Sequence, residues 1–198
     1  MQSDNDEFGW KGEPPVKWKA LVLSIWDWID PVYYFSTRLQ KISKENRSIF
    51  RVRLMKYRGR IIELQDGTRI CPSDMLLKIH LHNVKLLKEI MNLKGDVRKG
   101  RHLYRATEAA LPYLAAYLRQ HPKCNEIKAI LGITMINRGT GSLGFQVVPI
   151  ANRWYGAFKW IILFPIYLLS VSHPVRSFKK CHPVYLIMSR DTLFEKYG

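Results

Sequence analysis

The stretch LLKIHLHN, residues 76–83, alternates between apolar and polar side chains. Successive side chains of a β-strand point to opposite faces, so this period of two predicts a strand over residues 75–82. The apolar side chains at its odd positions would lie in a core, whereas Lys78, His80 and His82 would share the other face. The stretch therefore predicts a sheet with a buried face, and it places two imidazoles together on the polar face.

Shorter strand patterns precede this strand. In FRVRLMKY, residues 50–57, the side chains of Phe50, Val52 and Leu54 would face the core. Arg51 and Arg53 would lie on the other face. The segments RIIELQ and TRI follow, and Asp66-Gly67 between them is a strong hairpin signal. Four strands in succession predict an antiparallel meander.

Helical and strand patterns alternate in the rest of the chain. In order, they are helices over 84–94 and 101–120, an apolar strand over 129–136 with FQVVPI as its partner strand, a helix over 151–171, the strand VYLIMS and a final helical turn. Pro112 would kink or divide the second helix. This order predicts an α+β fold in a single domain, with an antiparallel or mixed β-sheet and helices packed on it.

The chain of 198 residues is long enough for one domain with its own core, which we place over residues 16–198. Residues 1–15 are rich in acidic residues, glycine and proline, so they predict a disordered acidic tail. We recognise no secretory signal and no apolar run of membrane-spanning length. Three well-separated cysteines without a CxxC pair agree with a reducing compartment, so we expect a cytoplasmic protein.

The chain is strongly basic, with a formal net charge of +16. No acidic residue occurs between Ile127 and Arg190. Such a surface attracts polyanions, so we expect an anionic membrane surface or an envelope polymer as the partner. Nucleic acid is less favoured, because no helix-turn-helix, zinc-finger or RNP-like pattern accompanies the charge. The alternative is that the charge only keeps the protein soluble.

Residues 151–171 combine aromatic side chains with flanking basic residues, which is typical of a helix at a membrane interface. We therefore expect the protein in the cytoplasm, with a peripheral site at the inner face of the membrane. The alternative is that this helix packs on the sheet as ordinary core. The candidates for contact with an anionic surface are Arg153, Lys159, Arg176, Lys179 and Lys180.

His80 and His82 on one strand face could contact a metal ion, but a site needs a third ligand. No other histidine or acid lies at a ligand-like spacing, so we expect no metal and no other cofactor. The loop over 139–144 matches G-x-G-x-x-G, but a strand rather than a helix follows it, so it does not predict a dinucleotide site. Asn137 and Arg138 at the base of this loop are candidate contacts for an anion.

Four stretches of the sequence are distinctive when taken together. They are FRVRLMKYRGRIIELQDGTRICPSDMLLKIHLHN, GITMINRG, LGF and YLIMSRDTLFEKYG. In these stretches the chain resembles the YkoP-like domain of Bacillota, and the resemblance covers about residues 20–198. The family occurs as short stand-alone proteins and as a C-terminal domain of some polysaccharide deacetylases. The resemblance implies an envelope-glycan context and glycan-modifying enzymes as partners, although this chain lacks the deacetylase catalytic domain.

In the versions fused to deacetylases, the stretch that corresponds to residues 78–83 is similar to E-(L/I)-H-F-D-N. His80 and Asn83 match this pattern, whereas His82 stands in the place of an aspartate. An imidazole can donate a hydrogen bond, but it cannot supply a fixed negative charge. The resemblance therefore implies His80 and Asn83 as site residues.

Together these patterns predict a non-catalytic accessory protein that binds an anionic partner and is linked to cell-envelope polysaccharide metabolism. The alternative is a small enzyme that uses His80 and Asn83 in envelope-glycan chemistry, for which no catalytic residue is assigned. A nucleic-acid-binding protein is a third interpretation, based on charge alone. The candidate ligand-binding residues are His80, His82, Asn83, Asn137 and Arg138.

Overall fold

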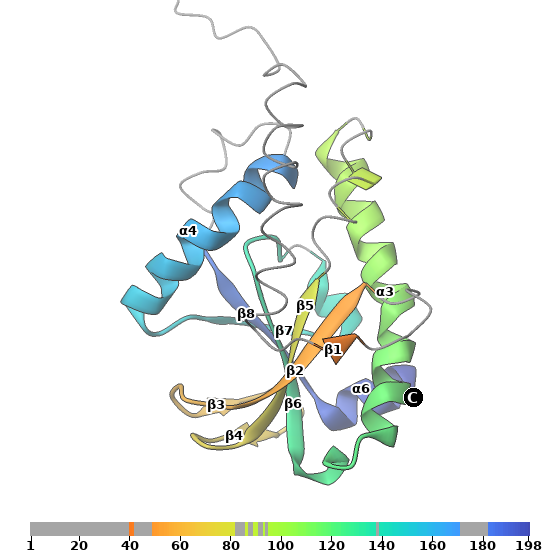
Figure 1. Cartoon of the computed structure of the whole chain (residues 1–198), viewed down its shortest axis with the longest axis vertical. Coiled ribbons are helices and arrows are strands. Elements are labelled where there is room, and N and C mark those ends of the chain that lie inside the picture. Colours follow the sequence, from red (N-terminus) through yellow and green to blue (C-terminus); the bar gives the residue numbers. More distant parts are fainter. Residues whose placement is uncertain are drawn as a thin grey trace, which may run out of the picture.

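The computed structural model describes residues 40–41, 49–81, 86, 89–90, 93, 95–137, 139–170 and 182–198 (Figure 1). The tail predicted over residues 1–15 lies outside the described residues. Several candidate site residues also lie outside them, namely His82, Asn83, Arg138, Arg176, Lys179 and Lys180.

A six-stranded sheet with the strand order β1-β2-β5-β6-β8-β7 forms the centre of the fold (Figure 1). Its neighbouring strands are antiparallel except for β5 and β6, which are parallel. The strands are β1 (Gln40–Lys41), β2 (Phe50–Lys56), β5 (Met75–Leu81), β6 (Ile127–Thr134), β7 (Gln146–Pro149) and β8 (Val184–Ser189). This mixed sheet with its helices confirms the predicted α+β fold.

The predicted four-strand meander is wrong, because β3 (Ile62–Glu63) and β4 (Arg69–Ile70) form a separate two-stranded sheet. β2 instead pairs directly with β5. The backbone N–H of Tyr57 donates to Asp74 and that of Ser73 donates to Tyr57, both at 2.8 Å. These bonds extend the β2–β5 pairing to the base of the β3–β4 hairpin, so the hairpin projects beyond the main sheet.

The partner predicted for the apolar strand is also wrong, because β8 lies between β6 and β7. β8 contains Ile187 and Met188, adjacent residues that are each only 1% exposed. Because adjacent side chains of a strand point to opposite faces, β8 suits an interior position that is covered on both faces. β7 contains Pro149, which cannot donate a backbone hydrogen bond and therefore suits a strand at the edge of a sheet.

Helices lie on both sides of the main sheet. α3 (Asp96–Gln120) and α6 (Arg190–Tyr197) lie on one side, and α4 (Arg153–Ser170) lies on the other (Figure 1). α3 runs through Pro112 as one continuous helix, so the predicted division at this residue does not occur. Within the parts of the chain that the structure describes, no helix has both the length and the hydrophobicity that crossing a bilayer requires.

The sheet separates two apolar cores. On the α3 side, helix residues spaced three to four apart pack on alternate residues of the strands. This first core includes Val52, Leu77, Ile79, Ile130, Leu111, Leu114 and Leu118. On the opposite face, the other set of alternate residues packs with the β3–β4 sheet. This second core includes Tyr57, Leu64, Ile70, Leu76, Leu131 and Ile187.

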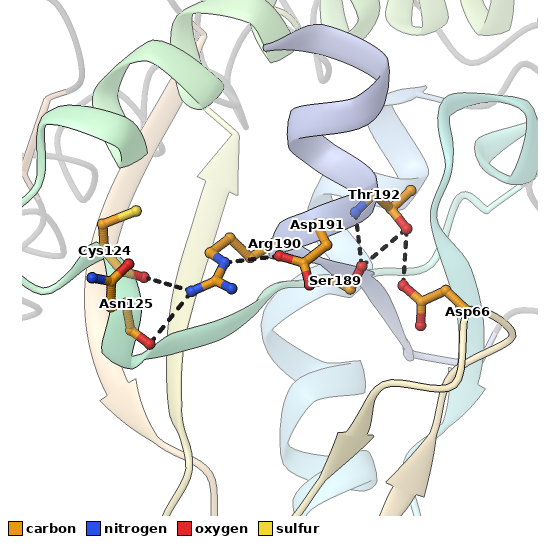
Figure 2. Close-up of polar contacts among 7 residues, drawn as sticks. All are labelled: Asp66, Cys124, Asn125, Ser189, Arg190, Asp191 and Thr192. Carbon is orange, nitrogen blue, oxygen red and sulfur yellow. Dashed lines mark hydrogen bonds and ion pairs between the residues drawn. The ribbon is translucent and has the colours of Figure 1, made fainter.

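Polar contacts fix the start of α6 against the β3–β4 turn (Figure 2). The Ser189 hydroxyl caps the helix by accepting a hydrogen bond from the backbone N–H of Thr192 at 2.9 Å. The Thr192 hydroxyl donates to the Asp66 carboxylate, also at 2.9 Å. These residues belong to the stretches DGTRI and SRDT, so this part of the family resemblance corresponds to a structural contact that holds the C-terminal helix.

Candidate anion-binding site

The polar faces of β2 and β5 carry four basic residues in register. In this antiparallel pair, Arg51 lies opposite His80, and Arg53 lies opposite Lys78. Side chains of directly opposite residues point to the same face, with Cβ atoms about 4.5–5.5 Å apart. The pairing therefore gathers four basic side chains on one face of the sheet, where like charges repel one another.

This face is covered rather than open to solvent. Lys78 is only 3% exposed, although lysine is rarely buried in proteins without a partner. Nε of Arg53 and Nε2 of His80 are also shielded from solvent. Leu76, two residues before Lys78 on the same face of β5, lies in the second core. The basic residues therefore lie next to this apolar core on the same face of the sheet.

α4 adds a further cation to this layer. Lys159 lies close enough to Lys78 and His80 for its charge to lower the pKa of both groups. Its ammonium group also lies 5.4 Å from the ring centroid of Tyr155 and 5.6 Å from that of Phe158. The side chains that meet between the sheet and α4 are here called the inner basic cluster: Arg53, Lys78, His80 and Lys159.

Burial lowers the pKa of Lys78 from 10.5 to about 7, and the charges of Lys159 and Arg53 add to this effect. The pKa of Lys159 is lowered in the same way, first by burial and then by Arg53. The neighbouring cations thus disfavour the charged forms of Lys78 and Lys159. The Lys78 amine therefore titrates near neutral pH, so an anion that comes near would favour its charged form.

His80 is neutral at physiological pH. Burial is the largest cause, and together with nearby cations such as Lys78 and Arg53 it lowers the pKa of His80 from 6.5 to about 3. A neutral imidazole can donate one hydrogen bond and accept another. A group with so low a pKa is a weak base near neutral pH, so this environment disfavours general acid–base catalysis by His80.

Tyr155, which contacts Lys159 of the cluster, lies near two further tyrosines. Burial raises the pKa of Tyr185 on β8 to about 12, with smaller contributions from Tyr155 and Tyr57. A phenol that stays neutral keeps its O–H as a hydrogen-bond donor. Tyr155 also contacts Lys159, so it connects these aromatic residues to the cluster.

The inner basic cluster has the chemistry of an oxyanion site. Arginine offers a planar fork of N–H donors and lysine offers a compact positive charge, the two groups that most often bind phosphate. A metal cation would be repelled by the same charges. Among the residues that the structure describes, no group of three or more histidine, cysteine or acidic side chains is arranged to hold a metal ion.

The structure brings together residues that the sequence placed in two separate sets. His80, a predicted ligand contact, and Lys159, a predicted surface contact, both belong to the inner basic cluster. Arg153 is exposed at the first residue of α4. Asn137 lies in the turn before η2 (Thr140–Leu143), where its carbonyl oxygen accepts hydrogen bonds from N and Oγ1 of Thr140.

Arg53 and Lys78 were not among the site residues predicted from the sequence. A signal was available, because both occupy polar positions in alternating strands, on the same faces as Arg51 and His80. The register that sets Arg53 opposite Lys78 depends on the direct pairing of β2 with β5. The predicted meander placed other strands between them, so it could not bring the two residues together.

Comparison with known proteins identifies the family. The family model described as "YkoP domain" matches residues 19–197. A protein of Bacillus subtilis (strain 168), named "Uncharacterized protein YkoP", is 41% identical over 179 residues, which cover 90% of this chain and 97% of that protein. No solved structure matches the chain. The chain therefore belongs to the YkoP domain family.

Proposed function

We propose that the chain is a non-catalytic binding protein for an anionic partner, and that a phosphate group of this partner occupies the inner basic cluster. The observation that carries the proposal is the burial of Lys78 directly opposite Arg53 and close to Lys159. A buried cation beside other cations is unfavourable unless an opposite charge compensates it. A negatively charged phosphate group would supply such compensation.

The pKa of Lys78 indicates how unfavourable the buried charge of this one residue is. One pKa unit corresponds to about 1.4 kcal/mol, so a pKa lowered from 10.5 to about 7 represents an unfavourable contribution of about 5 kcal/mol when Lys78 is charged. A bound anion would raise this pKa again and recover part of that free energy. Binding should therefore be coupled to the uptake of a proton above neutral pH.

The phosphate chemistry has two possible sources in the cell, namely the head group of an anionic lipid and a phosphate-bearing envelope polymer. The resemblance to domains joined to polysaccharide deacetylases supports the envelope context, with glycan-modifying enzymes as neighbours. A peripheral position at the inner face of the membrane would give access to both sources. The proposed role is thus that of an accessory domain that recognises the anion without transforming it.

A second candidate function follows from the state of Lys78. Near pH 7 a fraction of the molecules has a neutral Lys78 amine, and this amine could add to the carbonyl carbon of an anionic oxo-compound. Loss of water would give an iminium ion, which borohydride reduces to a stable secondary amine. Incubation with pyruvate and borohydride, followed by mass spectrometry, would detect this product on Lys78. An unmodified Lys78 after this treatment would leave binding as the better account.

Calorimetric titration with glycerol phosphate tests the binding proposal. We expect saturable binding that falls at least about tenfold for Arg53→Gln, since loss of one charged hydrogen-bond donor costs roughly 1.5–3 kcal/mol. Lys56→Gln is a matched control, because Lys56 lies on the same strand but is exposed. Titration with phosphatidylglycerol vesicles and with a soluble polyglycerol phosphate separates the two sources. Equal affinity of the wild type and Arg53→Gln for glycerol phosphate would contradict the proposed site.

A further inference from the structure

The outward side of α4 carries a row of exposed apolar side chains. Trp154 is 88% exposed, Phe158 is 57% exposed and Ile161 is 65% exposed. Their spacing of four and then three residues places them on one face of the helix. These three residues are here called the outer stripe.

The opposite side of the same helix faces the sheet. Lys159 belongs to the inner basic cluster, and Tyr167 is only 4% exposed. The usual polarity of a surface helix is thus partly reversed in α4, because a lysine faces the sheet and large apolar side chains face outward. Single exposed apolar residues are common in soluble proteins, but an exposed row with two aromatic rings marks an interaction surface.

We infer that the outer stripe docks α4 onto an anionic lipid bilayer, with the helix axis in the plane of the interface. Charge complementarity identifies this partner, because the sequence from Ile127 to Arg190 contains no acidic residue. Within these limits Arg153 is exposed at the start of α4, whereas Lys128 and Arg190 form ion pairs with Asp74 and Asp191. An exposed arginine beside the outer stripe attracts α4 to anionic head groups, and this attraction falls off within a Debye length.

The composition of the stripe favours a bilayer interface over an apolar protein groove. Tryptophan and phenylalanine insert at the boundary between head groups and acyl chains, while an adjacent arginine such as Arg153 remains among the phosphates. α4 has 18 residues, so it is about 27 Å long and offers several turns to the surface. Docking through the outer stripe would place the inner basic cluster directly beneath the membrane-bound helix.

This inference goes beyond the proposed phosphate site and can fail independently of it. Co-sedimentation with vesicles tests the stripe, whereas calorimetry with glycerol phosphate tests the cluster. The stripe variant replaces Trp154 and Ile161 with alanine and keeps Phe158, because the Phe158 ring contacts the Lys159 ammonium group of the cluster. The matched control replaces two exposed apolar residues on other elements with alanine, namely Ile61 and Tyr113.

We expect the wild type and the control variant to sediment with vesicles that contain phosphatidylglycerol at low salt, and to bind less at high salt. The stripe variant should bind these vesicles at least about tenfold more weakly while its affinity for glycerol phosphate stays unchanged. Sedimentation of the stripe variant equal to that of the wild type would overturn the inference. So would an absence of wild-type sedimentation, or a lipid-free wild-type dimer that the stripe variant converts to a monomer, because a second copy would then cover the stripe.

Discussion

Replacement of Lys78 by methionine should stabilise the unliganded protein. Methionine has nearly the same length as lysine without its charge, and the side chain is only 3% exposed. Burial, with Lys159 and Arg53, lowers the pKa of Lys78 from 10.5 to about 7. Because the pKa of Lys78 is lower in the folded state than in the unfolded state, the unfolded chain binds more protons at pH values between the two pKa values. The stability of the wild type therefore rises with pH through this window.

The size of the effect follows from the same pKa values. Below about pH 7 the amine is charged in both states, and its burial opposes folding by about 5 kcal/mol. At about pH 9 the buried amine is neutral, so the opposing contribution falls to about 2 kcal/mol. Lys78→Met removes this contribution, so its advantage over the wild type should be larger by about 3 kcal/mol at about pH 6 than at about pH 9.

Urea denaturation followed by circular dichroism at the two pH values measures this difference. Lys56→Met, which changes an exposed lysine on the neighbouring strand, should change stability by less than about 0.5 kcal/mol at either pH. If Lys78→Met is less stable than the wild type, or if its advantage does not depend on pH, the buried charge of Lys78 is not the unfavourable feature described here.

Three further predictions concern other parts of the molecule. Gly144 has a φ of +91°, and a Cβ there would lie 3.2 Å from atoms of Lys196 and Met188, so Gly144→Ala should lower the free energy of unfolding by about 1–3 kcal/mol in urea denaturation. Burial raises the pKa of Asp66, but hydrogen bonds to its carboxylate outweigh burial and hold the pKa below its ordinary value. Its stabilising contribution should be present above about pH 4 and disappear at lower pH, so Asp66→Ala should be less stable than the wild type by about 1 kcal/mol only at the higher pH. Metal analysis of untagged protein should find well below one equivalent of bound metal, and a stoichiometric ion that is lost in His80→Ala would contradict this expectation.

Strand β5 shows which features a local sequence pattern can predict. Its period of two correctly assigns Leu77 and Ile79 to a core, because alternation is a property of the strand itself. The same pattern placed Lys78 and His80 on the other face, but it gave no information about what covers that face. Lys159 of α4, about eighty residues later in the sequence, lies near that face, and its position depends on tertiary packing.

Strand order was the part of the fold that the sequence did not predict. Short segments such as β3 and β4 follow β2 directly, and sequential strands commonly pair, so a meander was the simplest expectation. In the structure they leave the main sheet, and β2 meets β5 instead. The candidate site depends on this long-range pairing, because it sets Arg53 opposite Lys78. His80 and Lys159 were recognised individually, but their meeting could not be read from spacing.

Proton uptake on phosphate binding tests most directly the claim that the inner basic cluster holds an anion. Calorimetry of glycerol phosphate binding at about pH 8, in two buffers with different ionisation enthalpies, counts the protons exchanged. The phosphate is already doubly charged at this pH, since its second pKa is about 6. The Lys78 amine is mostly neutral at one unit above its pKa, so the bound phosphate should draw in a fraction approaching one proton. We expect this uptake in the wild type and in Lys56→Met, and its absence in Lys78→Met. Binding without proton uptake, or the same uptake in Lys78→Met, would contradict a phosphate site at Lys78.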